Sequence, residues 1–388
     1  SSPPGGSRTA AHCRSRLRSA VVVGAGVFGG SLALRLVSSG WEVTLVEQYP
    51  PGHVRAASGG ESRLIRFSHG GNDWYTRSAR RALDLWRELE QETGTELFVR
   101  SGVAWFFSGT HGWGDESERV LKEQGVATER LTPDEGARLF PSFDGQGLES
   151  ILFEPEAGVL RARDATRVIS ELAVQRGARF VTGTAAPDGD AVLVDGERLE
   201  GDRIIWAGGA WLVGLFPELV DLRVTRQDVY FFGAPACWQV PSVPGWVDFD
   251  SGIYGVGELD GRGFKASPDR EGPPFDPDAG ERVASAEKER EAREYLALRF
   301  PALGGAPLVG TRSCPYSLTE DTNFLIAPHP EHGHVWLLGG GSGHGFKHGP
   351  ALAEYVERLL EGTDEPDPMF GLGERSPGGG LRAPWIER

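Results

Sequence analysis

A regular order of hydrophobic patterns begins near residue 19. A β-branched run at 19–23 is followed by a glycine-rich turn at 24–30, a helical pattern at 31–39 and a second strand-like run at 42–46. This order and spacing predict a β-α-β unit.

Later segments repeat both patterns. Apolar positions recur at helical spacing at 74–93 and 164–176, which predicts two amphipathic helices. Between about 224 and 315 the chain is rich in glycine, proline and aromatic residues with short alternating strands, which is typical of an antiparallel sheet. A strand at 334–340 and a helix at 351–362 follow. We therefore predict one β-α-β-type domain that is interrupted twice by a mostly antiparallel domain.

Length, charge and cysteine content narrow the class of protein. The chain has 388 residues, which fits two domains better than one, and a net charge of −15, which makes nucleic acid an unlikely partner. The longest apolar stretch, 20–34, is broken by four glycines, so we expect no membrane span. Cys13, Cys237 and Cys314 are an odd number in a long chain, which argues against a disulfide framework and for the cytoplasm.

Lysine is rare among the basic residues. Of 40 such residues, only Lys122, Lys265, Lys288 and Lys347 are lysine. Arginine replaces lysine poorly where a compact ammonium charge is needed. A solvated helix face explains Lys122 and Lys288, which lie in charged helical runs. Lys265 and Lys347 lie beside glycine and phenylalanine, so we expect a specific role for both.

Gly24, Gly26 and Gly29 form a G-x-G-x-x-G motif that follows the first strand and opens the helix. Gly24 would make the tight turn, Gly26 would let the backbone approach a pyrophosphate, and Gly29 would let helix and strand pack closely. The helix N-terminus offers free N–H groups to phosphates. Glu47, at the end of the next strand, would accept hydrogen bonds from the adenosine ribose. This context favours a dinucleotide site over an ordinary glycine turn, but it does not distinguish FAD from NAD.

Several further motifs bear on that choice. From Ala20 to about Gly362 the chain resembles the monomeric sarcosine oxidase and N-methyltryptophan oxidase branch of the D-amino-acid oxidase family, which has glycine-oxidase-like members. The motifs that carry the resemblance are GESRLIRFSHG, FEPEAGVLRA, IIWAGGAW, the pair IYG and GFK, SCPYSLTEDTNFLIAPHPE and GGGSGHGFKHGP.

The resemblance implies a mixed α/β fold. A Rossmann-type FAD-binding domain, like that of p-hydroxybenzoate hydroxylase, would carry a mostly antiparallel β-sheet substrate domain over the flavin. We expect a disordered N-terminal extension at 1–18. The FAD-binding domain is expected at 19–98, 152–222 and 315–362, and the substrate domain at 99–151, 223–314 and 363–388.

The resemblance also implies catalytic and substrate-binding roles. In the family, the arginine that matches Arg63 lies near the flavin ring, and the tyrosine that matches Tyr254 contacts the substrate. Arg66 and Lys347 would hold the substrate carboxylate, since an unpaired anion in a dry pocket is very costly. Lys265 would lie on the opposite flavin face, where its charge stabilises the superoxide formed from oxygen. The alternative is that both lysines are surface charges beside glycine turns.

The cofactor that the resemblance implies is FAD. We expect no metal site, because no pair of His or Cys residues has metal-ligand spacing with partners. His344 is expected to be a loop residue near the flavin rather than a general base. The residues expected to bind FAD are Gly24, Gly26, Val27, Phe28, Gly29, Glu47, Gln48, Ser58, Arg63, Ala186, Ala207, Gly208, Cys314, Gly343, His344, Gly345, Phe346 and Lys347.

Two departures from the family pattern leave alternatives open. Cys314 matches the cysteine that carries the flavin through a thioether, but the family's histidines before the GESR segment are replaced by Ser58-Gly59-Gly60. A small buried thiol is the alternative for Cys314. Asp269 stands where the sarcosine oxidases have a histidine. It would either bind a cationic or polar part of the substrate or face solvent.

We therefore expect an FAD-dependent oxidase of a carboxylate-bearing secondary amine, an N-substituted glycine or an N-methyl amino acid. Oxidation would give an imine and H2O2, and the imine would hydrolyse to an amine and an aldehyde or glyoxylate. The expected partners are oxygen and this small amine, which we expect to be a biosynthetic substrate. The chain is expected to be a monomer or weak homodimer. Other hypotheses are a flavin dehydrogenase with a different acceptor, a non-catalytic flavin-binding subunit and, least favoured, an NAD-dependent dehydrogenase.

Overall fold

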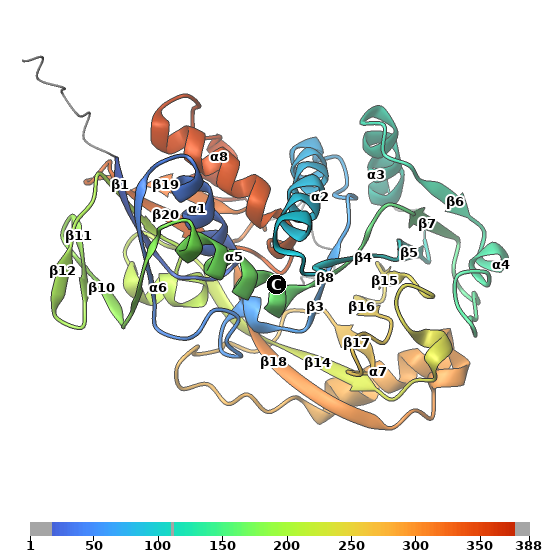
Figure 1. The fold of residues 1–388 in the computed structure, drawn as a ribbon. Helices are drawn as coiled ribbons and strands as arrows, with labels where there is room; N and C mark the ends of the chain where they lie inside the picture. The colour runs from blue at the N-terminus through green and yellow to red at the C-terminus, as the bar shows by residue number, and fades with distance from the viewer. Residues whose placement is uncertain (1–17, 110–111, 377–388) are drawn as a thin grey trace, which may run out of the picture.

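The computed structural model describes residues 18–109 and 112–376. Apart from residue 18, the predicted N-terminal extension lies outside the described residues, as does the end of the predicted substrate domain after residue 376. Two large sheets dominate the fold, one on the left of Figure 1 and one on the right and below.

The first large sheet has six strands and is almost entirely parallel. Only its edge strand β19 is antiparallel to its neighbour. This arrangement is the one that β-α-β units produce. In spatial order the strands are β19 (Leu325–Pro328), β20 (Val335–Gly339), β13 (Arg203–Trp206), β1 (Ser19–Val23), β2 (Glu42–Glu47) and β9 (Arg179–Thr182).

Strand β1 is buried on both faces, because the sheet lies between two layers. Ala20 and Val22 pack into the apolar cluster formed with the helices on one face. Val21 and Val23 pack into a second cluster on the other face. The helices are α1 (Val27–Ser38), α5 (Ala162–Gln175) and α8 (Gly349–Glu361), and the second layer contains β10 (Ala185–Asp188), β11 (Ala191–Val194), β12 (Glu197–Leu199) and α6 (Leu212–Leu215).

The second large sheet has eight strands, and all neighbouring pairs but one are antiparallel. The exception is the parallel pair β5 and β15. The spatial order is β18 (Leu308–Leu318), β14 (Arg223–Phe232), β17 (Phe264–Pro268), β16 (Ile253–Val256), β15 (Gly245–Asp248), β5 (Val103–Phe107), β7 (Ser150–Glu154) and β6 (Glu129–Leu131).

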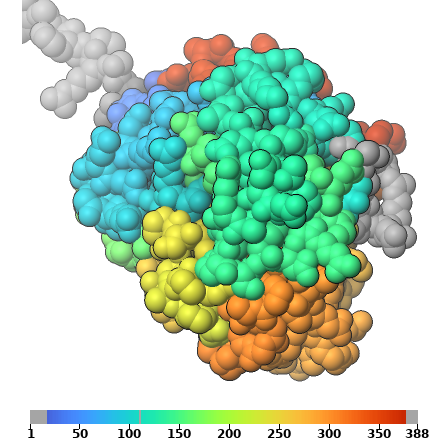
Figure 2. All heavy atoms as spheres, turned by 90° about the vertical axis from the view of Figure 1, so that its right-hand side faces the viewer, coloured from blue at the N-terminus to red at the C-terminus, as the bar shows by residue number. Residues whose placement is uncertain are grey.

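Helices lie against this sheet and in one of its connections. Helix α7 (Ala286–Arg299) packs against β14 and β17, and α3 (Gly112–Glu123) and α4 (Pro133–Gly136) lie in the segment that joins the strands of residues 103–154. Figure 2 shows this side of the molecule, with the segment that carries α3 and α4 above the segment that carries α7.

A small three-stranded sheet and a long helix connect the two halves. The sheet order is β3 (Ser62–Ile65), β8 (Gly158–Arg161) and β4 (Phe98–Arg100). Helix α2 (Asp73–Thr93) packs against α8. Short 3-10 helices are η1 (Ala57–Gly59), η2 (Gly209–Trp211), η3 (Ala236–Trp238), η4 (Pro301–Leu303), η5 (Phe346–His348) and η6 (Pro368–Phe370).

The mixed α/β fold class predicted from the sequence is confirmed. Helix α1 begins at Val27, earlier than predicted, because Gly26 is its N-cap and the glycine motif forms its first turn. The predicted domain boundaries stay a prediction. Strands β4, β7 and β18 run across three of them, near residues 98, 151 and 314, because each strand continues its sheet pairing past the predicted boundary.

Within the described ranges, no helix is both long and apolar enough to cross a bilayer. The cysteines in those ranges, Cys237 and Cys314, are both free thiols, the first exposed and the second buried.

Candidate active site

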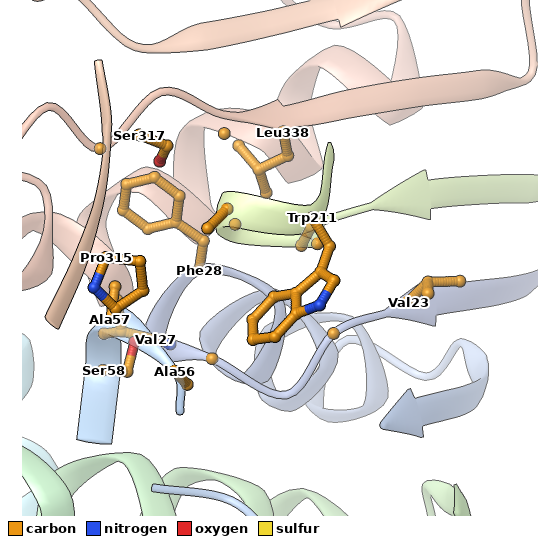
Figure 3. A pocket seen from close by; sticks show the side chains of 18 of the residues that line it. Val23, Val27, Phe28, Ala56, Ala57, Ser58, Trp211, Pro315, Ser317 and Leu338 are labelled. Atoms are coloured by element: carbon orange, nitrogen blue, oxygen red, sulfur yellow. Dashed lines mark hydrogen bonds between the residues drawn. The ribbon is translucent and has the colours of Figure 1, made fainter. Parts of the chain in front are cut away.

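A cavity of about 600 Å³ lies at the carboxyl ends of β1, β2 and β13, beside the first turn of α1. Figure 3 shows Val23 at the end of β1, Val27 and Phe28 in the first turn of α1, and Trp211 across from them. The carboxyl ends of parallel strands are where open α/β sheets bind ligands. The volume is in the range of pockets that bury a cofactor.

The glycine turn at this cavity cannot carry side chains at two positions. Gly24 has φ +105°, and a Cβ there would lie 2.4 Å from the carbonyl oxygen of Ala207 on the neighbouring strand. A Cβ at Gly29 would lie 1.9 Å from the carbonyl oxygen of Gly24. Glycine therefore permits both the turn and the close packing of α1 on β1.

The N-terminus of α1 faces this cavity with little side-chain capping. Its N-cap residue Gly26 has no side chain, and no acidic residue lies in its first turn. The N–H of Val27 donates a 3.0 Å hydrogen bond to Oγ of Ser58, which also lines the cavity. The positive end of the helix dipole and the remaining N–H groups fit a pyrophosphate.

Glu47 lies at the cavity end of β2. Its Oε2 accepts a 2.7 Å hydrogen bond from the N–H of Ala25, and its Oε1 accepts a 3.1 Å bond from the N–H of Tyr49. Burial raises the pKa of Glu47, although these backbone hydrogen bonds oppose the shift. The carboxylate has lone pairs left for ribose hydroxyl donors.

One wall of the cavity comes from a loop that the sequence analysis did not single out. Asp278 lies in this loop and accepts a 2.8 Å hydrogen bond from Nε1 of Trp211 through Oδ1. Its backbone oxygen accepts a 2.8 Å bond from Arg55. Trp211 belongs to the IIWAGGAW motif, whereas the irregular loop around Asp278 carries no comparable signal.

The structure brings most of the predicted FAD-binding residues together. Ala186 is exposed and does not line the cavity, whereas Ala185 beside it does, because neighbouring strand residues face opposite sides. Gly29 and Cys314 also lie behind the lining, and His344 and Lys347 line a second pocket. The predicted residues that line the cavity are Gly24, Gly26, Val27, Phe28, Glu47, Gln48, Ser58, Arg63, Ala207, Gly208, Gly343, Gly345 and Phe346.

A second pocket of about 80 Å³ adjoins the large cavity. The two share Arg63, Tyr316, Gly343 and Phe346 as lining residues. The second pocket is therefore next to the large cavity and much smaller. Its other polar lining residues are Arg66, Tyr254, Asp269, His344 and Lys347.

Arg66 and Lys347 reach this pocket from different elements. Arg66 follows β3, donates a hydrogen bond to the backbone oxygen of Ser68 and lies 4.8 Å from the ring centroid of Trp105. Lys347, in η5, is 2% exposed and donates a 2.8 Å hydrogen bond from Nζ to the backbone oxygen of His344. Burial lowers the pKa of Lys347 well below its usual value, and Arg66 lowers it further. An anion that enters the pocket favours the charged lysine again.

Glu154 holds the segment that carries Arg66. It is fully buried and accepts hydrogen bonds from the N–H of Phe67 at 2.6 Å and the N–H of Ser68 at 3.3 Å. It also accepts bonds from the Ser68 hydroxyl at 2.6 Å and from Nε1 of Trp105 at 2.7 Å. Its charge raises the pKa of Lys347, against the effect of burial. Glu154 lies in the FEPEAGVLRA motif, but no role was predicted for it.

Lys265 lies on β17 behind the second pocket. It is 2% exposed, and its Nζ is 4.8 Å from the ring centroid of Tyr254, which lines the pocket. Arg63 lines both cavities, and its guanidinium donates to the backbone oxygens of Ser62 at 2.7 Å and Ala57 at 2.6 Å. Burial lowers the pKa of Arg63, but Cys314 and other nearby groups raise it overall.

The two departures from the family pattern concern Cys314 and Asp269, which both lie near Tyr316. Cys314 is 3% exposed on β18, and both Arg63 and Arg282 are close enough to interact with it electrostatically. Asp269 is half-buried, and its Oδ1 accepts a 3.4 Å hydrogen bond from the hydroxyl of Tyr316. Asp269 therefore lines the pocket and does not face only solvent.

Comparison with known proteins agrees with this geometry. Residues 19–359 match the profile of the family described as FAD dependent oxidoreductase, DAO. The chain is 32% identical over 365 residues to a monomeric sarcosine oxidase from Bacillus sp. (strain B-0618), covering 89% of this chain and 93% of that one. It is 27% identical over 372 residues to an N-methyl-L-tryptophan oxidase from Salmonella arizonae, covering 91% of this chain and 96% of that one. The L-proline dehydrogenase from P. horikoshii has the same fold, with a TM-score of 0.81 at 20% identity, over 92% of this chain and 97% of that one.

Proposed function

The chain belongs to the family of FAD-dependent oxidoreductases whose profile it matches, and from this premise we propose that it oxidises a small secondary amine that carries a carboxylate, with oxygen as the electron acceptor. The observation that carries the proposal is that two cationic side chains, Arg66 and Lys347, line one small pocket that shares its wall with the FAD cavity. Sequence similarity to a monomeric sarcosine oxidase and to an N-methyl-L-tryptophan oxidase supports a substrate of this class.

FAD fits the large cavity. Gly24 and Gly26 provide the turn, the N-terminus of α1 would hold the pyrophosphate, and Glu47 would accept hydrogen bonds from the ribose. Bound FAD supplies the two-electron acceptor for the amine and the donor for oxygen.

The residues of the second pocket bind and orient the substrate. The carboxylate is paired with Arg66 and Lys347, which offsets the cost of burying it. The fixed carboxylate directs the amine and its α-carbon towards the wall that the pocket shares with the large cavity. Tyr254 packs against the substrate from the neighbouring sheet.

The reaction is balanced with the amine, O2 and water as its reactants. The amine loses two electrons and two protons as its C–N bond becomes an imine, and O2 takes up both electrons and both protons to give H2O2. Water then adds to the imine and splits it into an amine and an aldehyde or glyoxylate. The ammonium group of Lys265 stabilises superoxide, the anion that oxygen forms on taking up the first electron.

Asp269 distinguishes this pocket from one that binds sarcosine. Its carboxylate lines the pocket beside Tyr316, and Lys288 is close enough to interact with it. A substituent with a cationic or hydrogen-bond-donating group pairs with Asp269 better than a methyl group does. The proposed substrate is therefore an N-substituted glycine or N-methyl amino acid with a polar side group, as in a biosynthetic pathway.

The remaining features of the proposal follow from the sequence. The excess of negative charge supports a small-molecule substrate rather than nucleic acid, and the cysteine content supports the cytoplasm. The proposed state is a monomer or weak homodimer, and the proposed attachment of FAD is a thioether through Cys314.

Anaerobic mixing with a panel of N-alkyl glycines and N-methyl amino acids tests the proposed function. At least one carboxylate-bearing amine is expected to bleach the flavin absorbance. If none reduces the flavin, while the protein still contains FAD, the assignment as an amine oxidase is wrong.

A further inference from the structure

Three buried histidines meet beside the substrate pocket. His69 follows β3, His344 lies in the loop after β20, and His348 ends η5. Their exposed fractions are 1%, 6% and 0%, and one ring nitrogen of each lies within 4.8 Å of one ring nitrogen of the other two. His69 lies far from the other two histidines in the sequence and forms no motif with them. For this reason no metal site was predicted.

In each histidine, one ring nitrogen lies at hydrogen-bond distance from an oxygen. Nδ1 of His69 lies 2.9 Å from the backbone oxygen of Phe67, and Nε2 of His344 lies 2.9 Å from that of Thr322. A carbonyl oxygen only accepts, so these two nitrogens carry the protons and the opposite nitrogens carry lone pairs. Nδ1 of His348 lies 2.9 Å from the hydroxyl of Ser78.

This pattern is the one that metal-binding histidines show. Such residues donate the outer N–H to a carbonyl or similar oxygen, which fixes the ring and its tautomer. Nε2 of His69 and Nε2 of His348 are buried without a hydrogen-bond partner among the described residues. A buried polar atom of this kind is costly unless something binds it.

We propose that His69, His344 and His348 bind one transition-metal ion of the zinc or copper class. Three histidines with an open fourth position are a known donor set for such ions. Ring nitrogens lie about 2.0–2.1 Å from zinc, which corresponds to nitrogen separations of about 3.4 Å. From separations of up to 4.8 Å, each ring moves inward by less than about 1 Å to reach that geometry.

The surrounding charges select the class of ion. Arg66 and Lys347 both interact electrostatically with the histidines and oppose any cation there. The cluster has no carboxylate ligand, and Ca²⁺ and Mg²⁺ depend on anionic and carbonyl oxygens. Ions that bind neutral imidazole strongly are the ones that overcome this opposing field. Such an ion ties the segment before α2 to the loop after β20 and to η5.

Co²⁺ titration of the FAD-loaded protein, after treatment with a chelator, tests the site. The expected result is saturation near one equivalent, with visible ligand-field bands at longer wavelengths than the flavin absorbance. Zn²⁺ is expected to displace the Co²⁺. A bridging water in place of a metal ion gives no such bands, and their absence from the wild-type protein overturns the proposal.

Histidine variants test whether the Co²⁺ bands come from the cluster of His69, His344 and His348. H69Q and H348Q each are expected to lower Co²⁺ affinity by at least tenfold, with the flavin spectrum reporting that the variants are folded. The matched control is H332Q, which removes one of a pair of histidines near the surface whose rings lie 4.9 Å apart. Bands that persist in both cluster variants but disappear in H332Q overturn the proposal.

Discussion

The indole N–H of Trp105 donates a 2.7 Å hydrogen bond to Oε1 of Glu154. The same carboxylate accepts the N–H groups of Phe67 and Ser68, which directly follow Arg66 in the chain. The guanidinium of Arg66 in turn lies 4.8 Å from the Trp105 ring centroid. Glu154 thus fixes both the backbone that carries Arg66, the arginine proposed to bind the substrate, and the ring on which Arg66 packs.

E154Q is expected to weaken substrate binding more than it slows turnover. A glutamine offers only one acceptor oxygen. Its amide N–H groups would face N–H and O–H groups that donate hydrogen bonds to the carboxylate in the wild-type protein. KM for the carboxylate substrate is expected to rise about tenfold, which corresponds to about 1.4 kcal/mol, with a smaller change in kcat. The control is E156Q, an exposed neighbour in the same motif. An unchanged KM in E154Q contradicts the positioning role.

Cys314 is expected to carry FAD through a covalent bond. The cysteine lies in the SCPYS segment, where the resemblance implies a thioether to the flavin, and both Arg63 and Arg282 interact with it electrostatically. After acid denaturation the flavin absorbance is expected to stay with the wild-type protein and with the C237S control, and to separate from C314S. Release of all flavin from the wild-type protein shows that attachment is non-covalent.

E47Q is expected to weaken FAD binding. The carboxylate forms charge-assisted hydrogen bonds, which contribute about 1.5–3 kcal/mol each, so a loss of about tenfold or more in affinity follows. Titration of apoprotein with FAD in a C314S background keeps the binding reversible. E42Q, at the exposed start of the same strand, is the matched control. Equal Kd values for E47Q and E42Q rule out the ribose contact.

K265M is expected to slow the oxidation of reduced flavin by oxygen about a hundredfold, the usual effect of removing one group that stabilises a developing anion. Reduction by the amine is expected to change much less. Stopped-flow measurement of the two half-reactions separates these effects, with K122M on the exposed face of α3 as control. Equal loss in both half-reactions means that Lys265 acts on structure and not on oxygen.

The sequence predicted features that depend on local pattern. The β-α-β unit, the glycine turn and Glu47 lie within one continuous stretch, where spacing alone determines the geometry. Contacts between distant segments were not predictable in this way. Glu154 meets Phe67 across 87 residues, and the loop of Asp278 reaches Trp211 across 67. Ala185 lines the cavity and the predicted Ala186 does not, because alternate residues of a strand face opposite sides.

The measurement that tests the central proposal most directly compares an N-methyl amino acid with its carboxamide in anaerobic flavin reduction. The two molecules differ in the negative charge that Arg66 and Lys347 are proposed to bind. The acid is expected to reduce the flavin with saturable kinetics, and the amide is expected to bind at least tenfold more weakly. K347A is expected to weaken binding of the acid and to leave that of the amide nearly unchanged. Equal reduction by acid and amide in the wild-type protein contradicts the proposed clamp.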